Sequence, residues 1–184
     1  MNQSNMIRVL IVDDHPVVRQ GLVAIVELEP DLTVVGIAGD GCSAVEAFRQ
    51  QRPDVTLMDL RMPEMGGVDA ITAICAEFDN ARIVVLTTYD GDEDIYRGLR
   101  AGAKGYLLKD ADPDELLEAI RAVHRGQTCI PPAVGAKLAE RMVIPQLSDR
   151  ELEVLRLMAT GKSNQEIGTA LCITERTVKF HINN

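Results

Sequence analysis

Apolar and polar residues follow two different periods along the first two-thirds of the chain. Five short runs of β-branched and aliphatic residues occur at 7–14, 32–38, 54–60, 82–88 and 105–110. The segments between them place their apolar residues at helical spacing, at 15–30, 41–53, 67–80, 90–103 and 111–126. Strands that are apolar throughout are typical of a sheet buried on both faces. The pattern therefore predicts an α/β fold of five β-α units around a parallel sheet.

The pattern changes after residue 125. Residues 126–146 contain a Pro-Pro pair and one short helical stretch at 133–142, which is typical of a linker. Residues 147–184 have the spacing of three helices. We therefore expect one domain at 1–125, a linker at 126–146 and a small all-α domain at 147–184.

Polar residues mark the expected ends of the three C-terminal helices. Ser148 and Glu151 have the spacing of a capping box at the start of the first helix, which Gly161 ends. Ser163 and Thr174 are candidate caps of the second and third helices.

The net charge of −9 is concentrated in the predicted first domain, which has 12 Lys and Arg against 22 Asp and Glu. This excess argues against non-specific nucleic-acid binding by that domain, whereas the neutral tail can bind DNA if its charges lie on one face. The four cysteines form no Cys-x-x-Cys pair, so we expect free thiols in a reducing cytoplasm and no structural zinc. No apolar run has the length of a membrane span.

Four of the five predicted strands end in a polar or charged residue. The first ends in Asp13 and Asp14, the third in Asp59, the fourth in Thr87, and Lys109 follows the fifth. Ligands of open parallel sheets bind at the carboxyl ends of the strands, so we expect these groups to converge. Taken singly, each has an ordinary explanation: a turn-forming carboxylate, a solvated lysine or a threonine that fills a strand.

Converging carboxylates require a cation. Two unit charges about 4 Å apart repel by roughly 4 kcal/mol at an effective dielectric constant of about 20. Hard oxygen ligands without histidine or cysteine favour Mg²⁺, which binds one or two carboxylates together with water and phosphate. A lysine and a hydroxyl beside such a metal suit phosphoryl transfer to an aspartate.

Four segments resemble the receiver domain of bacterial response regulators: VLIVDDHPVVRQGL, DVTLMDLRMPEMGG, IVVLTTYD and AGAKGYLLKD. The tail LSDRELEVLRLMATGKSNQEIGTALCITERTVKFHINN resembles a LuxR-type helix-turn-helix. Their order is that of the NarL/FixJ class. The resemblance implies a flavodoxin-like receiver with strand order 2-1-3-4-5, followed by a linker and a DNA-binding domain.

The resemblance implies a role for each group at the strand ends. Asp59 is the expected phosphoacceptor, and Asp14, Asp59 and the backbone carbonyl of Arg61 are expected to bind Mg²⁺. Asp13 is expected to hold a water molecule on the metal.

The expected phosphoryl-oxygen ligands are Lys109 and Thr87. Tyr106 is expected to be an aromatic switch that turns inward as the Thr87 hydroxyl moves to the phosphate. Plain packing of Tyr106 on its strand is the alternative.

The resemblance also places the last helix in the major groove of DNA. The expected base contacts are Lys179, Phe180 and Asn183, and the residues expected near phosphates are Thr177, Ser163 and Asn164. Two alternatives stay open: Phe180 fills the core of the tail, or the tail is a helical protein-interaction module. The family domain has a fourth helix after this one, which this sequence does not reach; we therefore expect a less stable tail that binds DNA weakly.

The function implied is phosphorylation-dependent regulation of transcription. A sensor histidine kinase and double-stranded DNA are the expected partners, with homodimerisation on phosphorylation and no membrane partner. The chain is not expected to be an enzyme beyond its own phosphorylation and dephosphorylation. One alternative is a receiver that signals only through protein contacts. Another, an aspartyl-phosphate hydrolase, is disfavoured because Arg61 stands where such enzymes usually have a second aspartate.

Overall fold

The computed structural model describes residues 6–88, 92–132, 134–135 and 149–183. Two compact units make up the chain, Met1–Arg141 and Met142–Asn184, and each is described by itself. Ser148 and most of the helical stretch expected at 133–142 lie outside the described residues. The residues expected to form a linker are divided between the two units, so the boundaries at 125 and 147 stay predictions.

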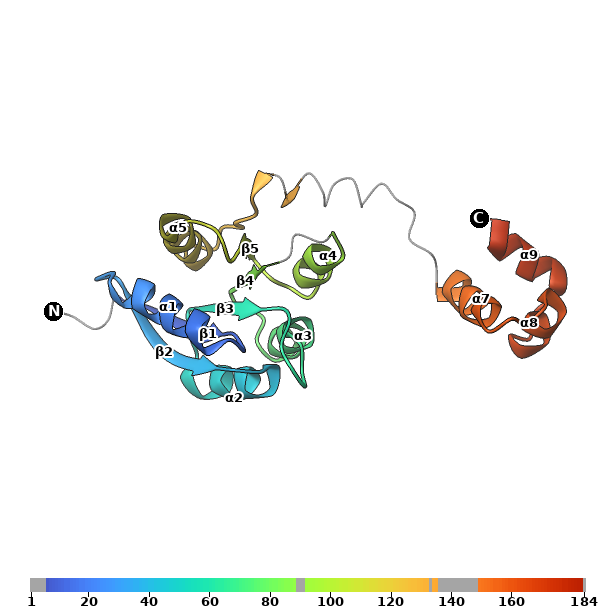
Figure 1. Ribbon diagram of the computed structural model, residues 1–184, viewed down its shortest axis with the longest axis horizontal. Helices are drawn as coiled ribbons and strands as arrows, with labels where there is room; N and C mark the ends of the chain where they lie inside the picture. Colours follow the sequence, from blue (N-terminus) through green and yellow to red (C-terminus); the bar gives the residue numbers. More distant parts are fainter. Residues whose placement is uncertain (1–5, 89–91, 133, 136–148, 184) are drawn as a thin grey trace. The chain divides into compact units, whose positions relative to one another are not determined.

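The first unit contains a five-stranded parallel sheet (Figure 1). Its strands run in the order β2-β1-β3-β4-β5, which confirms the expected order. Their bounds are β1 Ile7–Val12, β2 Leu32–Ala38, β3 Val55–Asp59, β4 Ile83–Thr87 and β5 Gly105–Leu108. The strands are shorter than the apolar runs suggested because the polar residues that follow β1, β4 and β5 belong to the loops.

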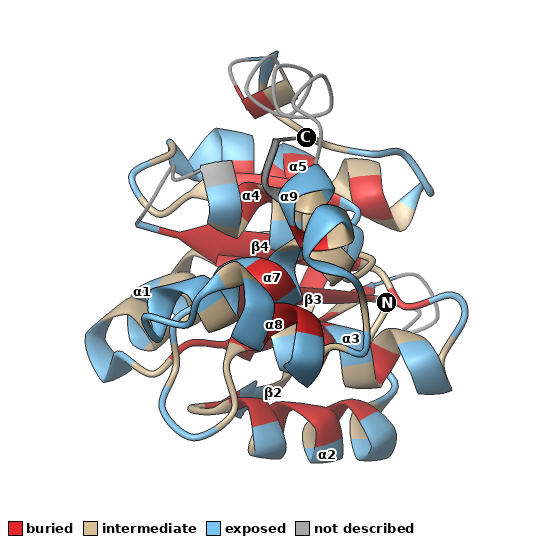
Figure 2. Cartoon of the chain, turned by 90° about the vertical axis from the view of Figure 1, so that its right-hand side faces the viewer, coloured by how far each residue is buried: buried red, intermediate tan, exposed pale blue. Residues whose placement is uncertain are grey.

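Helices cover both faces of the sheet (Figure 1). One face is covered by α2 (Gly41–Gln51), α3 (Gly67–Glu77) and α4 (Asp92–Arg100), and their apolar contacts form what we call the α2–α4 core. The other face is covered by α1 (Pro16–Glu27) and α5 (Pro113–His124), which form the α1/α5 core. Every residue of β3 and β4 is buried, and α2 turns its buried residues to one side (Figure 2).

One polar side chain is buried in the sheet without a hydrogen bond. Thr56 of β3 is fully buried, and its Oγ1 has no partner among the described residues. Burying an unpaired hydroxyl costs about 1–3 kcal/mol. We expect Thr56→Val, which keeps the shape, to raise the free energy of unfolding by about 1 kcal/mol in urea denaturation. Thr72→Val is the control because the exposed Thr72 hydroxyl donates to the Val68 carbonyl at 2.8 Å. Equal or lower stability of Thr56→Val would contradict this.

An ion-pair network joins α5 to the turn before β2. The Arg121 guanidinium donates to both carboxylate oxygens of Asp31, at 2.8 and 2.7 Å, and to Glu29 at 2.6 Å. This hydrogen bonding outweighs partial burial and holds the pKa of Asp31 below its ordinary value. A carboxylate with a lowered pKa stabilises the fold above its unfolded-state pKa and loses that contribution as pH falls.

The pH dependence of stability should therefore change in Asp31→Asn. At pH 7 we expect the variant to be less stable by about 0.5–1 kcal/mol, a small figure because the pair is partly exposed. The difference should shrink as pH falls from about 5 towards 3. Urea denaturation across this range tests it, with the exposed Asp79→Asn as control; a difference that stays constant with pH would refute the assignment.

The segment after α5 returns to the edge of the sheet. Cys129 forms a parallel bridge with Gly105 of β5. The Cys129 N–H donates to the Lys104 carbonyl, and the Tyr106 N–H donates to the Cys129 carbonyl, both at 2.9 Å. The first part of the expected linker therefore packs with the first unit.

The second unit contains three described helices, α7 (Asp149–Ala159), α8 (Asn164–Ala170) and α9 (Glu175–Asn183). Val154, Ile167 and Val178, one from each helix, form its small buried core. Gly161, with φ +79°, follows α7 as expected. Among the described residues of the whole chain, no helix is both long and apolar enough to cross a bilayer.

The expected caps of α8 and α9 are present. Ser163 and Glu166 form a capping box in which each side chain bonds the backbone N–H of the other residue. Thr174 Oγ1 accepts the Thr177 N–H at 3.1 Å. The hydrogen bond from the Ser163 N–H holds the pKa of Glu166 below its ordinary value.

Candidate functional site

Three of the groups predicted to converge lie in direct contact. Lys109 Nζ is 2.6 Å from Asp13 Oδ2 and 2.6 Å from Asp59 Oδ2. Both carboxylates are almost fully buried. Burial disfavours the charged ammonium, but the hydrogen bonds and charges of Asp13 and Asp59 outweigh it and raise the pKa of Lys109. Lys109, whose side chain is 11% exposed, is therefore a charged counter-ion of two buried carboxylates.

A third carboxylate and a histidine complete a group whose possible ligand atoms lie close together. One ligand atom from each of Asp13, Asp14, His15 and Asp59 lies within 4.8 Å of the others. His15 Nδ1 is 2.6 Å from Asp14 Oδ1. The backbone N–H of His15 donates to Asp13 Oδ1 at 2.8 Å. Three carboxylates face one lysine and one histidine, so the oxygen-rich donor set fits a hard divalent cation. His15 is not among the residues predicted from the sequence, although it directly follows the two aspartates.

The loop between β3 and α3 contacts the side chain of Asp59 through one backbone N–H. The Arg61 N–H donates to Asp59 Oδ1 at 3.2 Å, and the Arg61 side chain forms an ion pair with Asp94 of α4 at 2.9 Å. The Gly67 N–H donates to the Leu60 carbonyl at 2.9 Å, which brings the start of α3 against the end of β3. The expected role of the Arg61 carbonyl as a metal ligand stays a prediction.

The two residues expected to form the switch lie in the adjacent strands. Thr87 is buried at the end of β4, and its carbonyl accepts the Lys109 N–H at 2.8 Å. Tyr106 of β5 is fully buried in the α2–α4 core, opposite Val85 of β4. Both the expected switch and its alternative, plain packing on the strand, place Tyr106 in this inward position.

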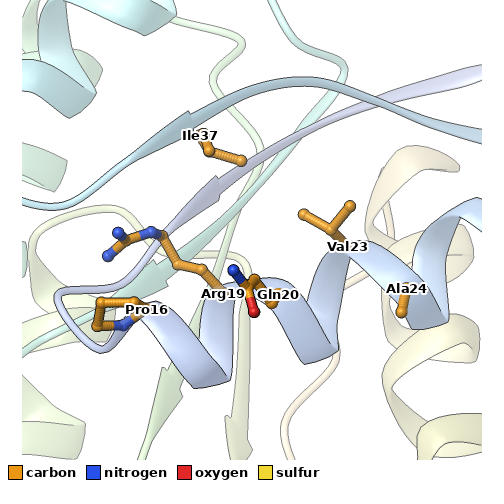
Figure 3. Close-up of a pocket in the computed structure, with 6 residues that line it drawn as sticks. All are labelled: Pro16, Arg19, Gln20, Val23, Ala24 and Ile37. Carbon is orange, nitrogen blue, oxygen red and sulfur yellow. The ribbon is translucent and has the colours of Figure 1, made fainter.

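A separate pocket of about 350 Å³ lies between α1 and β2 (Figure 3). Its lining is Pro16, Arg19, Gln20, Val23, Ala24 and Ile37. None of these residues belongs to the acidic group. The Arg19 guanidinium also donates to the Asp13 carbonyl, so one wall of the pocket supports the loop that carries the acidic group.

The last helix exposes two of the three expected base-contacting residues. Phe180 is 61% exposed, so the alternative that it fills the core is wrong. Lys179 is exposed and pairs with Glu175 one turn earlier at 2.8 Å. Val178 is fully buried and orients the helix. The side chain of Asn183 lies outside the described residues.

The three residues expected near phosphates surround the starts of α8 and α9. The hydroxyl of Ser163 already bonds Glu166 at 2.7 Å, and the hydroxyl of Thr177 lies 2.8 Å from that of Thr174. Asn164 is the half-buried first residue of α8. Both helix starts contain backbone N–H groups of the kind that bind phosphate, but the assignment to phosphates stays a prediction.

Comparison with known proteins agrees with these two sites. Residues 9–121 match the response regulator receiver domain, and residues 145–184 match the bacterial regulatory proteins of the luxR family. The transcriptional regulatory protein LiaR of Bacillus subtilis is 44% identical over 97% of this chain and 89% of its own length. The nitrate/nitrite response regulator protein NarP of Escherichia coli is 42% identical over 100% and 89%.

A solved structure of two RcsB dimers bound to two parallel DNAs is 30% identical, with a TM-score of 0.73 over 96% of this chain and 88% of that one. The acidic strand ends, the five-stranded order and the three-helix tail all fall within the matched ranges. The chain belongs to the two-component response regulators of the NarL/FixJ class, in which a receiver domain is followed by a luxR-family domain that regulates transcription.

Proposed function

We propose that Asp59 accepts a phosphoryl group from a sensor histidine kinase and that this modification controls binding of the second unit to double-stranded DNA. The observation that carries the proposal is the Lys109 ammonium held 2.6 Å from both Asp13 and Asp59 at the carboxyl end of the sheet. The four cysteines, each a free thiol, fit action in the cytoplasm.

The residues around Asp59 suit an in-line transfer. An Asp59 oxygen attacks phosphorus, forming an O–P bond while the N–P bond to the kinase histidine breaks. Lys109 then binds an oxygen of the transferred group. Asp14, Asp59 and the Arg61 carbonyl would hold Mg²⁺, with Asp13 acting through a water. When bound, the ion neutralises charge that builds up on the phosphoryl oxygens. Hydrolysis of the aspartyl phosphate at the same site returns the protein to its first state.

Thr87 and Tyr106 are proposed to report the modification. In the phosphorylated arrangement, the Thr87 hydroxyl binds a phosphoryl oxygen and Tyr106 occupies the space beside it in the α2–α4 core. A shift from the unphosphorylated to this arrangement changes the surface around α4 and β5, which in turn favours homodimerisation.

The test is capture of fragments of the source genome by this chain in the presence of Mg²⁺. The three samples are untreated protein, protein with beryllium fluoride as a phosphoryl mimic, and Asp59→Asn treated in the same way. We expect discrete fragments to be enriched only with the mimic and only when Asp59 is present. Enrichment of the same fragments in all three samples would refute control by Asp59. No enrichment, together with mimic binding, would favour a receiver that signals only through protein contacts.

The assignment of the DNA surface has its own test. Lys179→Gln is expected to weaken binding of the captured fragment by about tenfold, because a contact to a base edge contributes about 1–3 kcal/mol. Arg125→Gln removes an exposed cation of the first unit and should leave affinity unchanged. Equal losses in both variants would indicate an effect of net charge alone.

A further inference from the structure

The outer edge of β5 pairs with a single residue of the segment that follows α5. β5 is the last strand in the sheet order, so one side of its backbone is free to pair. In this chain, Cys129 occupies that side through two hydrogen bonds, from its own N–H to Lys104 and from Tyr106 to its carbonyl. The free edge of the sheet is therefore closed by the segment that leads to the second unit.

The side chains of this segment pack on both sides of the sheet, as those of a strand do. Cys129 packs against the α1/α5 core, and burial raises the pKa of its thiol. Ile130 packs against the α2–α4 core, and Val134 is 5% exposed within it. Val134 thus lies in the same core as Tyr106 and anchors the segment after its single bridge.

Pro131, two residues after Cys129, limits the pairing to one bridge. In a parallel ladder that joins Cys129 to Gly105, the following donor would be the N–H of residue 131. Pro131 has no N–H, so the ladder ends there. The segment is held by two hydrogen bonds, one fully packed side chain (Val134) and two partly buried ones (Cys129 and Ile130), a smaller attachment than the ladders between the strands of the sheet.

The same short strand is fixed to the acidic site. Lys109 directly follows β5; its backbone N–H is bonded to Thr87, and its ammonium is bonded to Asp59. A phosphoryl group on Asp59 brings new oxygens between Lys109 and its carboxylate partners. Because β5 has only four residues, Gly105–Leu108, a shift of its end reaches the two backbone groups that hold Cys129.

We propose that residues 128–132 and Val134 form a reversible clamp on the β5 edge, held by the bridge at Cys129, and that phosphorylation of Asp59 releases it. The inference rests on the proposed phosphorylation of Asp59. It adds a physical route from the acidic site to the linker: Asp59, Lys109, β5 and then the bridge at Cys129.

Hydrogen–deuterium exchange of the full chain with Mg²⁺ tests the clamp. On addition of beryllium fluoride, we expect the amides of Tyr106 and Cys129 to exchange about tenfold faster or more, because opening of the bridge exposes them. Peptides that contain Asp59 and Lys109 report separately whether the mimic binds. A response there with unchanged exchange at Tyr106 and Cys129 would overturn the clamp and leave the proposed function standing. No response around Asp59 would overturn the proposed function and, with it, release by phosphorylation.

A pair of valine variants tests docking without the mimic. Val134→Ala should speed exchange at Tyr106 and Cys129 in the unmodified protein, whereas Val17→Ala, at a position that is 81% exposed on α1, should not. If binding of the mimic opens the clamp, weakening the clamp must favour binding of the mimic. Val134→Ala should therefore also bind beryllium fluoride several-fold more tightly. Unchanged exchange in Val134→Ala would show that the segment is not held by its buried side chain and would refute the clamp.

Discussion

Replacing Asp59 with asparagine is expected to abolish phosphorylation of the chain. Asparagine has nearly the same shape and can still accept a hydrogen bond from Lys109, but it lacks the nucleophilic carboxylate. Removing a nucleophile lowers the rate of a covalent step by more than about 10³-fold. Incorporation from a small-molecule phosphodonor in the presence of Mg²⁺, followed by intact mass, measures the effect without a kinase.

Stability separates this result from misfolding. Asp59→Asn removes one of the carboxylates that repel each other around Lys109, so the melting temperature should be equal to or above that of the unchanged chain. Asp69→Asn, at an exposed position in the first turn of α3, should retain full incorporation. Incorporation that persists in Asp59→Asn would move the acceptor to another carboxylate of the acidic group.

Replacing Gly67 with alanine is expected to be among the most destabilising single changes in the receiver. A Cβ at Gly67 would lie 2.0 Å from the Asp59 carbonyl oxygen and 2.8 Å from the Leu60 Cα. Both are backbone atoms, so no side chain can move aside. We expect the free energy of unfolding to fall by about 3 kcal/mol or more, as for other severe overpacking.

Urea denaturation measures this loss, and the chain offers a matched control. Gly21 lies inside α1, and a Cβ added there would have nothing within 4 Å. Gly21→Ala should therefore raise the free energy of unfolding by about 0.5–1 kcal/mol, because alanine favours a helix. A Gly67→Ala protein as stable as Gly21→Ala would show that α3 can move away from β3 at little cost.

The alternation of buried strands with helical segments was sufficient to predict the receiver fold from the sequence. Each period is a direct result of how side chains leave a strand or a helix, and the strand order followed from the family resemblance. The contact of Lys109 with Asp13 and Asp59 was predictable for a related reason: parallel strands end at the same edge. Asp13 and Lys109 each directly follow a strand, so their positions depend on the strand ends more than on the rest of the loop.

Features that depend on loops and on exposure were not predictable. The pairing of His15 with Asp14 and the ion pair of Arg61 with Asp94 depend on loop paths that no periodicity encodes. The sequence left Phe180 open between core and surface because the exposure of an aromatic residue on a short helix depends on how that helix packs.

The capping residues show the same contrast. Ser163 and Glu166 have the S-x-x-E spacing of a capping box, a local signal, although only Ser163 was predicted to be a cap. The bridge at Cys129 had no signal at all, since a single paired residue has no period.

The strand bridge at Cys129 also bears on how such proteins recombine. A fusion that joined a new output domain directly after α5 would leave the N–H of Tyr106 unpaired and the α2–α4 core without Val134. Open sheet edges beside apolar surface invite pairing between molecules and aggregation. The transferable module therefore extends at least to residue 135. We expect fusions made after residue 135 to keep a receiver whose sheet edge is closed, whereas fusions made directly after α5 should precipitate more readily.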